Sequence, residues 1–588
     1  MNQLEAKNLI QSTFQNQFDE HRFRNFAKNL FNDIDESKAF SHQGQYIPDA
    51  YKEHVHQLKR IGKYTDPEGA ELDVLIVGLK KESALDRART MQRNFIADYL
   101  KKRGEKDAAI VAYHTEGVDD WRFSYVRMDY RAEQDESGKV RVKTDLTPAR
   151  RYSFLVGKYE PNHTAQQQLL PILQDDQNNP TLAEIEKAFN IESITKEFFE
   201  RYKNLFLRVK EELDELVVKD SKIREDFAAK FINTADFAKK LLGQIVFLYF
   251  LQKKGWLGVE KDSSGNFKGW GSGPKDFLQR LHRKDIVPYD NFFNDLLQPL
   301  FYEALAIDRG EESYYSPFKC KIPFLNGGLF EPISGYNWQE TDILIRNETI
   351  GDVFSTFDQY NFTVREDEPL EKEVAVDPEM LGKVFENLLE VKDRKSKGAF
   401  YTPREIVHYM CQESLVNYLN GTLNASSIGY ERLGRKQTVL FGPEENAKPD
   451  GQMELMAKNG SAPIPLEDIE LFIRQGEFGI ENDLAKEQGT KSYAYKLPES
   501  IRTNAGRIDE ALSDIKICDP AIGSGAFPVG MLHEIVSARK TLNVYLGKSL
   551  ERTLYNFKRH AIQQSIYGVD IDCGAVDIAK LRLWLSLV

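Results

Sequence analysis

The sequence predicts a multidomain α/β protein, and three observations lead to that fold class. The 588 residues are too many for one hydrophobic core and should divide into about three or four domains. Strand-like and helical segments alternate within residues 1–157. Residues 515–532 have the order of an apolar strand, a glycine turn and a helix, which is typical of nucleotide-binding α/β folds.

Residues 1–170 are expected to form a small α/β domain. Four segments are strand-like because they are rich in β-branched and aromatic residues: 72–79, 108–114, 121–130 and 151–157. A helix between the first two strands is predicted from the near-helical spacing of its apolar residues: Leu85, Ala88, Met91, Phe95 and Leu100.

Two further domains are expected after that one. Residues 182–390 are mostly helical and form a connector domain, which ends in a helix with an Asp-Pro start, VDPEMLGKVFENLLE. Residues 391–588 hold the strand and glycine turn, interrupted by an irregular insertion of about 420–505 that has no sustained period.

Composition restricts location and partners. The apolar runs are much shorter than the roughly 20 residues needed to cross a bilayer, so no membrane partner is expected. The N-terminus has no export signal, and the four cysteines have no Cys-x-x-Cys spacing, so a cytoplasmic location fits best. The net charge of −12 neither suggests nor excludes nucleic acid, because a local basic surface decides such binding.

The glycine turn predicts a ligand at the end of a strand. Asp519 would lie at the carboxyl end of a buried parallel strand, where ligands bind in open α/β sheets. Gly523 and Gly525 lack a Cβ and allow close backbone approach, and Pro520 fixes one dihedral of the turn. The helix that starts near Ala526 presents free amide groups towards the ligand.

Two common nucleotide classes fit this turn poorly. A dinucleotide fingerprint needs glycine or alanine three residues after Gly525, where the sequence has Pro528. Its ribose-binding acid should follow about 20 residues on, but here the acid comes later, at Asp570. No Gly-Lys-Ser/Thr follows, so an ATP phosphate loop is also disfavoured.

Three motifs resemble those of the gamma-class N6-adenine DNA methyltransferases, and they occur in the gamma order. DPAIGSGAF resembles the first cofactor motif, GVDID the second, and KGAFYTP the motif that closes over the methionine end of S-adenosylmethionine. The resemblance implies that Asp570 binds the ribose hydroxyls of S-adenosylmethionine. The cofactor-binding residues that it implies are Tyr401, Thr402, Pro403, Asp519, Pro520, Gly523, Gly525, Phe527 and Asp570.

From about residue 182 to its end, the chain also resembles type IIG restriction-modification enzymes and phage-defence methylases. This resemblance implies that residues 391–588 are the first part of a Rossmann-like, S-adenosylmethionine-dependent methyltransferase domain. Adenine N6 in double-stranded DNA would be the target. In such enzymes an Asn/Asp-Pro-Pro-Tyr/Phe motif holds the flipped adenine, which stacks on the aromatic residue of the motif.

The sequence departs from that family in one respect that concerns catalysis. It contains no Asn-Pro-Pro or Asp-Pro-Pro, so no catalytic residue is assigned. The last helix is apolar and has no polar cap, and such a helix is expected to lie on a sheet. We therefore expect a fragment, or one piece of a split enzyme completed by a second chain, that cannot methylate DNA alone.

Type IIG enzymes often carry a Mg²⁺-dependent nuclease of the Pro-Asp…Asp/Glu-x-Lys type at the N-terminus. Asp49 and Asp73 could supply its two carboxylates. However, the required lysine is absent, because the residue two places after Glu71 is Asp73 and the residue two places after Asp73 is Leu75. We expect a degenerate nuclease-like or purely structural domain, no metal site, and a need for Mg²⁺ only if the nuclease is active.

Two classes of function remain open: an adenine-specific DNA methyltransferase, and a non-catalytic binding or scaffold subunit of a split methyltransferase complex. An RNA or protein methyltransferase is disfavoured by the gamma motif order. His114 and His408 are interpreted as structural histidines, since no catalytic partner is placed beside them. Trp256 and Trp270 flank a glycine-rich loop and are interpreted as packing residues.

Overall fold

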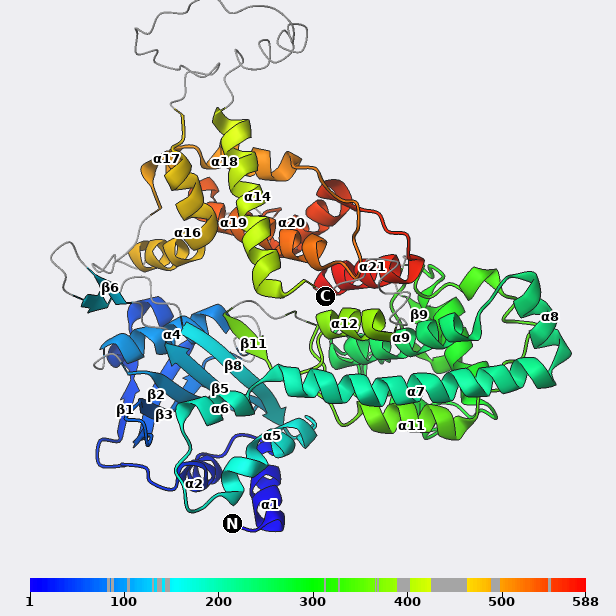
Figure 1. Cartoon of the computed structure of the whole chain (residues 1–588), viewed down its shortest axis with the longest axis horizontal. Coiled ribbons are helices and arrows are strands. Elements are labelled where there is room, and N and C mark those ends of the chain that lie inside the picture. The colour runs from blue at the N-terminus through cyan, green and yellow to red at the C-terminus, as the bar shows by residue number, and fades with distance from the viewer. Residues whose placement is uncertain are drawn as a thin grey trace, which may run out of the picture. The chain divides into compact units, whose positions relative to one another are not determined.

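The computed structural model describes the chain except for residues 82–84, 86–88, 103–105, 129–131, 135–139, 143–148, 311–312, 326–327, 365, 367–369, 389–401, 425–462, 488–496, 548–550 and 588. The chain forms two compact units (Figure 1). Unit 1 consists of Met1–Phe400 with Asp572–Ser586, and unit 2 of Tyr401–Ile571.

A seven-stranded mixed sheet organises the first part of unit 1. Its order is β1 (Phe40–Gln43), β2 (Val55–Thr65), β3 (Glu71–Leu79), β4 (Ala108–Thr115), β5 (Asp120–Met128), β8 (Ala149–Gly157) and β11 (Glu371–Glu373). The pairs β3–β4 and β8–β11 are parallel, and the other neighbours are antiparallel. The four predicted strands are confirmed, and the chain is a mixed α/β protein with many helices.

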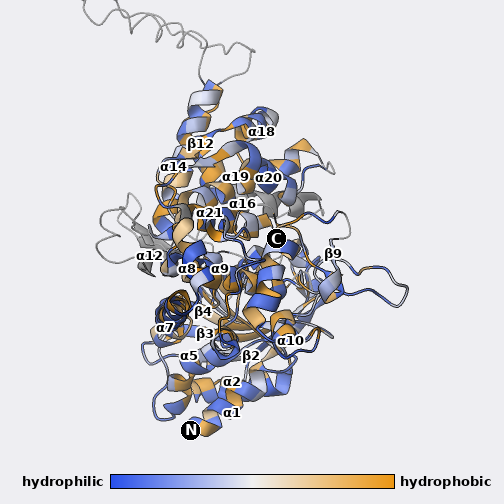
Figure 2. Cartoon of the chain, turned by 90° about the vertical axis from the view of Figure 1, so that its right-hand side faces the viewer, coloured by the Kyte–Doolittle hydropathy of each residue, from blue (hydrophilic) through white to orange (hydrophobic). Residues whose placement is uncertain are grey.

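Both faces of this sheet are buried, which explains the nearly continuous apolar runs of its central strands. In Figure 2 these strands are mainly orange, the colour of hydrophobic residues. One face packs against α1 (Gln3–Phe14), α2 (Glu20–Phe31) and α5 (His163–Gln174). The other face packs against α4 (Arg89–Lys102), the connection between the parallel strands β3 and β4. A short antiparallel pair, β6 (Ala132–Gln134) and β7 (Val140–Val142), lies outside the sheet.

The rest of unit 1 is mostly helical. Its longer helices are α6 (Leu182–Ala188), α7 (Ile191–Lys219), α8 (Ser221–Ala229), α9 (Thr234–Lys253), α10 (Phe277–His282), α11 (Asn347–Phe357), α12 (Pro378–Leu388) and α21 (Cys573–Leu587). Every residue of α9 from Leu241 to Gln252 is buried, so α9 is the central helix. Among the described residues, no helix combines the length and apolar character that a bilayer-spanning segment needs.

The apolar helix α21 packs on α9 and on the loop that follows it. The ring of Trp584 lies 5.5 Å from that of Phe247 on α9 and 5.9 Å from that of Trp256. Ile578, Leu581 and Leu585 join the same core. Apolar residues around a helix indicate burial but not the type of neighbour, so the sheet that we expected beneath α21 stays a prediction.

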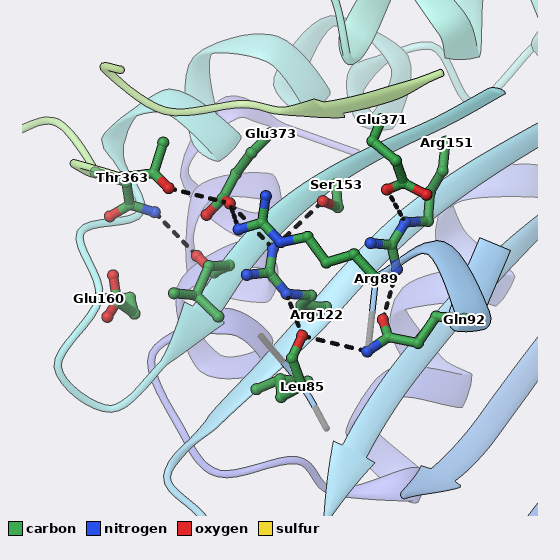
Figure 3. A network of polar contacts seen from close by, with 12 residues as sticks. Leu85, Arg89, Gln92, Arg122, Arg151, Ser153, Glu160, Thr363, Glu371 and Glu373 are labelled. Carbon is green, nitrogen blue, oxygen red and sulfur yellow. Dashed lines mark hydrogen bonds and ion pairs between the residues drawn. The ribbon is translucent and has the colours of Figure 1, made fainter. Parts of the chain in front are cut away.

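A buried ion cluster joins β11 to the sheet (Figure 3). The Arg151 Nε–H donates to Glu371 Oε2 at 2.8 Å, and Arg122 Nη1 lies 3.3 Å from Glu373 Oε2. Arg89 is also paired with Glu373. Residues within the range expected for the connector thus complete the N-terminal sheet. The division into domains 1–170, 182–390 and 391–588 stays a prediction.

Unit 2 is a small α/β unit. Helices α14 (Arg404–Asn424), α16 (Leu466–Glu487), α17 (Glu499–Thr503), α18 (Ala505–Asp514), α19 (Ala526–Leu546) and α20 (Leu554–His560) accompany two parallel strands, β12 (Ile517–Asp519) and β13 (Ile566–Gly568). The helix α16 lies in the stretch that we predicted to be irregular. Its buried residues Ile469 and Phe472 are one helical turn apart. A single pair at this spacing, within an otherwise polar sequence, does not make a recognisable helical pattern.

We predict that His114 makes unit 1 less stable in mild acid. Its ring stacks on Phe18 at 4.2 Å, and burial, followed by the charges of His56 and Lys59, lowers its pKa to about 4. Between pH 6.5 and 4 the unfolded chain therefore binds a proton that the folded chain does not, so stability falls as pH decreases. The loss should reach up to about 3 kcal/mol.

The matched variant is His114→Phe, which keeps an aromatic ring on Phe18 and cannot titrate. Urea unfolding at pH 7 and pH 4.5 should show a smaller acid-induced loss in the variant than in the wild type. Equal losses in the two proteins would contradict the prediction.

Candidate cofactor site

The two parallel strands of unit 2 end at the same edge and place two acids there. Asp519 is the last residue of β12, in register with Gly568 of β13, and Asp570 follows two residues after Gly568. Backbone hydrogen bonds continue beyond the strands, from Val569 N–H to Asp519 O at 2.9 Å and from Ile522 N–H to Val569 O at 3.0 Å. The two segments after the strands are therefore held side by side.

The glycine turn closes this edge. Gly523 and Gly525 have φ angles of 49° and 88°, in the left-handed region that favours glycine. The Ala521 N–H donates to Asp519 Oδ1 at 3.0 Å, and the Gly523 N–H donates to Asp570 Oδ2 at 2.9 Å. The structure thus brings together four of the predicted site residues, and the contact between Gly523 and Asp570 links the first motif to the second.

The helix α19 begins directly after this turn. Its N-cap is Gly525, which offers no side chain to accept hydrogen bonds from the first-turn amides. Those amides and the positive end of the helix dipole favour a ligand with hydrogen-bond acceptors or negative charge. Pro528 is buried in the first turn, where its lack of an N–H costs no helical hydrogen bond. Pro520 is exposed and Phe527 is half-buried.

The segment from the KGAFYTP motif lies beside the same helix. Tyr401 is outside the described residues, whereas Thr402 is half-buried and Pro403 accepts hydrogen bonds from the first amides of α14. Further along α14, Val407 and Cys411 pack on Gly530 of α19. A Cβ added to Gly530 would lie 2.7 Å from Val407 Cγ1, so the two helices meet at van der Waals distance there. The start of α14 and the turn before α19 therefore belong to one packed region of unit 2.

A buried acid that the sequence analysis missed joins these two helices. The Glu534 carboxylate on α19 pairs with His408 Nδ1 on α14 and accepts a hydrogen bond from Gln412 Nε2 at 3.2 Å. Such a partner is consistent with a structural role for His408. The signal was present, because a glutamate within the apolar run of α19 needs a polar partner if it is buried.

These residues fit an adenosyl cofactor in two respects. The left-handed glycines leave the backbone open to close approach, and the half-buried Asp570 carboxylate stands at the edge where parallel strands bind ligands. Carboxylates at this position can accept hydrogen bonds from ribose hydroxyls. The turn itself, DPAIGSGAF, contains no lysine or arginine, as suits a ligand without phosphates.

The two nuclease candidates have a different environment. Asp73 is fully buried on β3, where its carboxylate accepts hydrogen bonds from Arg60 Nη2 at 2.7 Å, Lys106 Nζ at 3.0 Å and Tyr99 Oη at 2.7 Å. Asp49 is exposed in a short 3₁₀ turn and pairs with Lys52. Within the described part of the chain, no three His, Cys, Asp or Glu side chains form a group able to hold a metal. The arrangement around Asp73 is that of a structural ion cluster.

Comparison with known proteins gives one informative similarity. No protein-family model matches the chain. A protein of Methanocaldococcus jannaschii named as a candidate type II restriction enzyme and methyltransferase is 29% identical over 420 residues. The match covers 68% of this chain and 30% of that protein, so the chain spans less than a third of its relative's length.

One solved structure was also found, that of the type IIL restriction-modification enzyme MmeI in complex with DNA. It is 12% identical, with a TM-score of 0.31, over 66% of this chain and 36% of that one. At that TM-score the match carries no argument about the fold or function of this chain. By sequence, the chain is therefore similar over two thirds of its length to a protein named for both restriction and methyl transfer.

Proposed function

We propose that the chain binds S-adenosylmethionine in a site-specific DNA methyltransferase that modifies adenine N6 in a restriction-modification or phage-defence system. The observation that carries the proposal is the hydrogen bond from the Gly523 N–H to Asp570, which joins the glycine turn to the acid after the second strand. The gamma order of the three motifs and the similarity to the M. jannaschii protein support it.

In this proposal each site residue has a role. Asp570 accepts hydrogen bonds from the ribose hydroxyls, and the turn from Asp519 to Phe527 supports the rest of the adenosyl group. Tyr401, Thr402 and Pro403 are assigned to binding the methionine end. When bound, S-adenosylmethionine supplies an activated methyl group. Double-stranded DNA is the proposed partner, and the cytoplasm is the proposed location.

A second candidate function rests on one observation of the sequence. It contains no Asn/Asp-Pro-Pro-Tyr motif, so the target adenine would be held by groups outside this sequence, for example on a second chain. The chain would then act as a non-catalytic binding or scaffold subunit of a split methyltransferase. Methyl transfer to unmodified DNA by the chain alone would exclude the scaffold function. Because both candidates predict no turnover by this chain alone, they are separated by whether the encoding DNA, or an adjacent reading frame, supplies an Asn/Asp-Pro-Pro-Tyr motif.

We predict that Asp570→Ala weakens S-adenosylmethionine binding by about 10- to 100-fold, which corresponds to the loss of hydrogen bonds to a charged group. Asp570→Asn keeps an acceptor for the Gly523 N–H and removes the charge, so it tests the ribose contact with the turn intact. Isothermal titration calorimetry on the full chain measures all the variants.

Asp514→Ala is the matched control for this prediction. Asp514 is exposed at the end of α18, three residues before β12, and should bind the cofactor like the wild type. Equal affinity of Asp570→Ala and the wild type would refute the site assignment.

A further inference from the structure

Two lysines and three aromatic rings gather on the surface of unit 1, in segments that the proposed cofactor site does not use. They come from the loop after α9 and from the strands β9 (Tyr314–Tyr315) and β10 (Cys320–Lys321). We call the set Lys261, Phe267, Trp270, Tyr314 and Lys321 the lysine–aromatic surface. Lys261, Trp270 and Tyr314 are exposed, while Phe267 and Lys321 are half-buried.

Short backbone pairings bring these residues together. The strands β9 and β10 are antiparallel, with Lys321 opposite Tyr314. The Lys321 N–H donates to Val259 O at 2.9 Å, and the Val259 N–H donates back to Lys321 O at 3.3 Å. Lys261 in turn pairs with Phe267 across a tight hairpin. Three segments that are separate in sequence therefore form the lysine–aromatic surface.

Backbone contacts hold the loop of the lysine–aromatic surface in one conformation. The N–H groups of Gly271 and Gly273 both donate to Gly255 O, at 3.1 Å and 2.9 Å. A Cβ added to Gly273 would lie 2.1 Å from Leu257 O, so only glycine permits this approach. The loop that carries Trp270 is therefore held against the end of α9.

The two ammonium groups lie over aromatic rings. Lys321 Nζ is 4.3 Å from the centroid of the Trp270 ring and 5.9 Å from that of Phe267. Lys261 Nζ is 4.8 Å from the Phe267 centroid and 5.7 Å from that of Tyr314. A ring face attracts an ammonium group and orients it but carries no charge to neutralise it.

The described acids near the lysine–aromatic surface form no ion pair with these lysines. Across the residues that the structure describes, neither Lys261 nor Lys321 has a carboxylate oxygen within ion-pair distance. The Asp262 carboxylate accepts hydrogen bonds from the Ser264 and Asn266 N–H groups at 2.8 Å and 3.0 Å, within its own turn. Glu260 is exposed and has no such contact among the described residues.

We propose that the lysine–aromatic surface binds the phosphate backbone of double-stranded DNA. The proposal rests on the proposed function, in which DNA is the substrate. A chain of net charge −12 repels a polyanion as a whole, so DNA has to be held at a local group of cations. Within the described part of the chain, Lys261 and Lys321 are two such cations without an ion pair to a carboxylate. Ammonium groups oriented by rings donate hydrogen bonds to phosphate oxygens without base specificity and so position the duplex.

The test is the salt dependence of DNA affinity. Fluorescence anisotropy with a labelled duplex of about 25 base pairs, between 50 and 200 mM salt, gives the slope of log K against log salt for each protein. Lys261→Ala with Lys321→Ala should reduce the slope by about two and weaken binding on the order of tenfold at the middle of the range. Arginine at both positions should keep the wild-type slope.

Lys203→Ala with Lys222→Ala is the control, because both lysines are exposed on α7 and α8 and the change in charge is the same. An equal effect of the control, or an unchanged slope in the first pair, would overturn the proposal. A loss confined to duplex RNA would assign the surface to RNA and overturn it too. Absence of DNA binding by the wild type would refute both this proposal and DNA as the partner, whereas cofactor binding by calorimetry is measured independently.

Discussion

Arg582→Met should lower the stability of unit 1 by about 3–5 kcal/mol, the usual cost of leaving one buried charge without its partner. Arg582 lies on α21 and is 3% exposed. Its Nε–H and Nη2–H donate to the two carboxylate oxygens of Glu366 at 2.6 Å and 2.7 Å. Burial would lower the pKa of Arg582, but Glu366 outweighs it, and the net pKa is raised.

The loss should be large because other buried acids also depend on this arginine. Burial, followed by the charge of Asp377, raises the pKa of Glu379 to about 7, and Arg582 is one of the two cations that oppose the rise. Removing Arg582 would leave three carboxylates in a poorly solvated region. Methionine fills a similar volume, so the loss of charge and not a cavity should dominate.

The double variant Arg582→Met with Glu366→Leu tests this explanation. Replacing both members of a buried ion pair by apolar residues is often neutral or stabilising, so the double variant should recover most of the loss. Tryptophan fluorescence during urea unfolding reports unit 1, because that unit contains all five tryptophans: Trp121, Trp256, Trp270, Trp338 and Trp584. A double variant as unstable as Arg582→Met would contradict the ion-pair explanation.

Glu373→Gln should have the second largest effect, also about 3–5 kcal/mol, by breaking the buried cluster that holds β11. Glu373 is 3% exposed and Arg122 is fully buried. The same carboxylate pairs with Arg89 and accepts a hydrogen bond from Thr363 at 3.4 Å. Glutamine keeps the shape and one acceptor but leaves the two arginines without this negative charge.

Lys372→Gln is the control for that prediction, since it changes a charge on the same strand at a half-buried position. Its effect on the free energy of unfolding, measured from the urea transition of tryptophan fluorescence, should be below about 1 kcal/mol, as is usual for partly exposed charges. A similar loss in both variants would show that any charge change on β11 destabilises the sheet, and would contradict the specific role of Glu373.

Strands β3, β4, β5 and β8 and the helix α4 could be predicted because each carries a local pattern, whereas β1, β2, α1, α2 and α5 were not predicted. Strands β3, β4, β5 and β8 are rich in β-branched and aromatic residues, and such patterns need no knowledge of distant contacts. The strand β11 could not be predicted, since its sequence, EKE, is charged throughout. Its two buried glutamates become favourable only opposite arginines that lie more than two hundred residues earlier.

The candidate cofactor site was predicted from motifs in the same way. The positions of Asp519, Gly523, Gly525 and Asp570 follow from a strand, a turn and a second strand end, so their types and order already indicated a common edge. Glu534 was missed because its partner His408 lies over a hundred residues away. The lysine–aromatic surface was missed for a related reason: Trp270 packs on Trp256 as predicted, but Lys321, which lies over its ring, is distant in sequence.

The sequence by itself determined the α/β class and the strands β3, β4, β5 and β8, and it predicted the turn residues for which a cofactor is proposed. Those features depend on side-chain periodicity and backbone freedom, which are local. Only the tertiary structure decided which charges meet: Asp73 with Arg60 and Lys106, and Arg582 with Glu366. Buried charges require partners but can find them anywhere along the chain, so their pairing is decided by the fold and not by sequence distance.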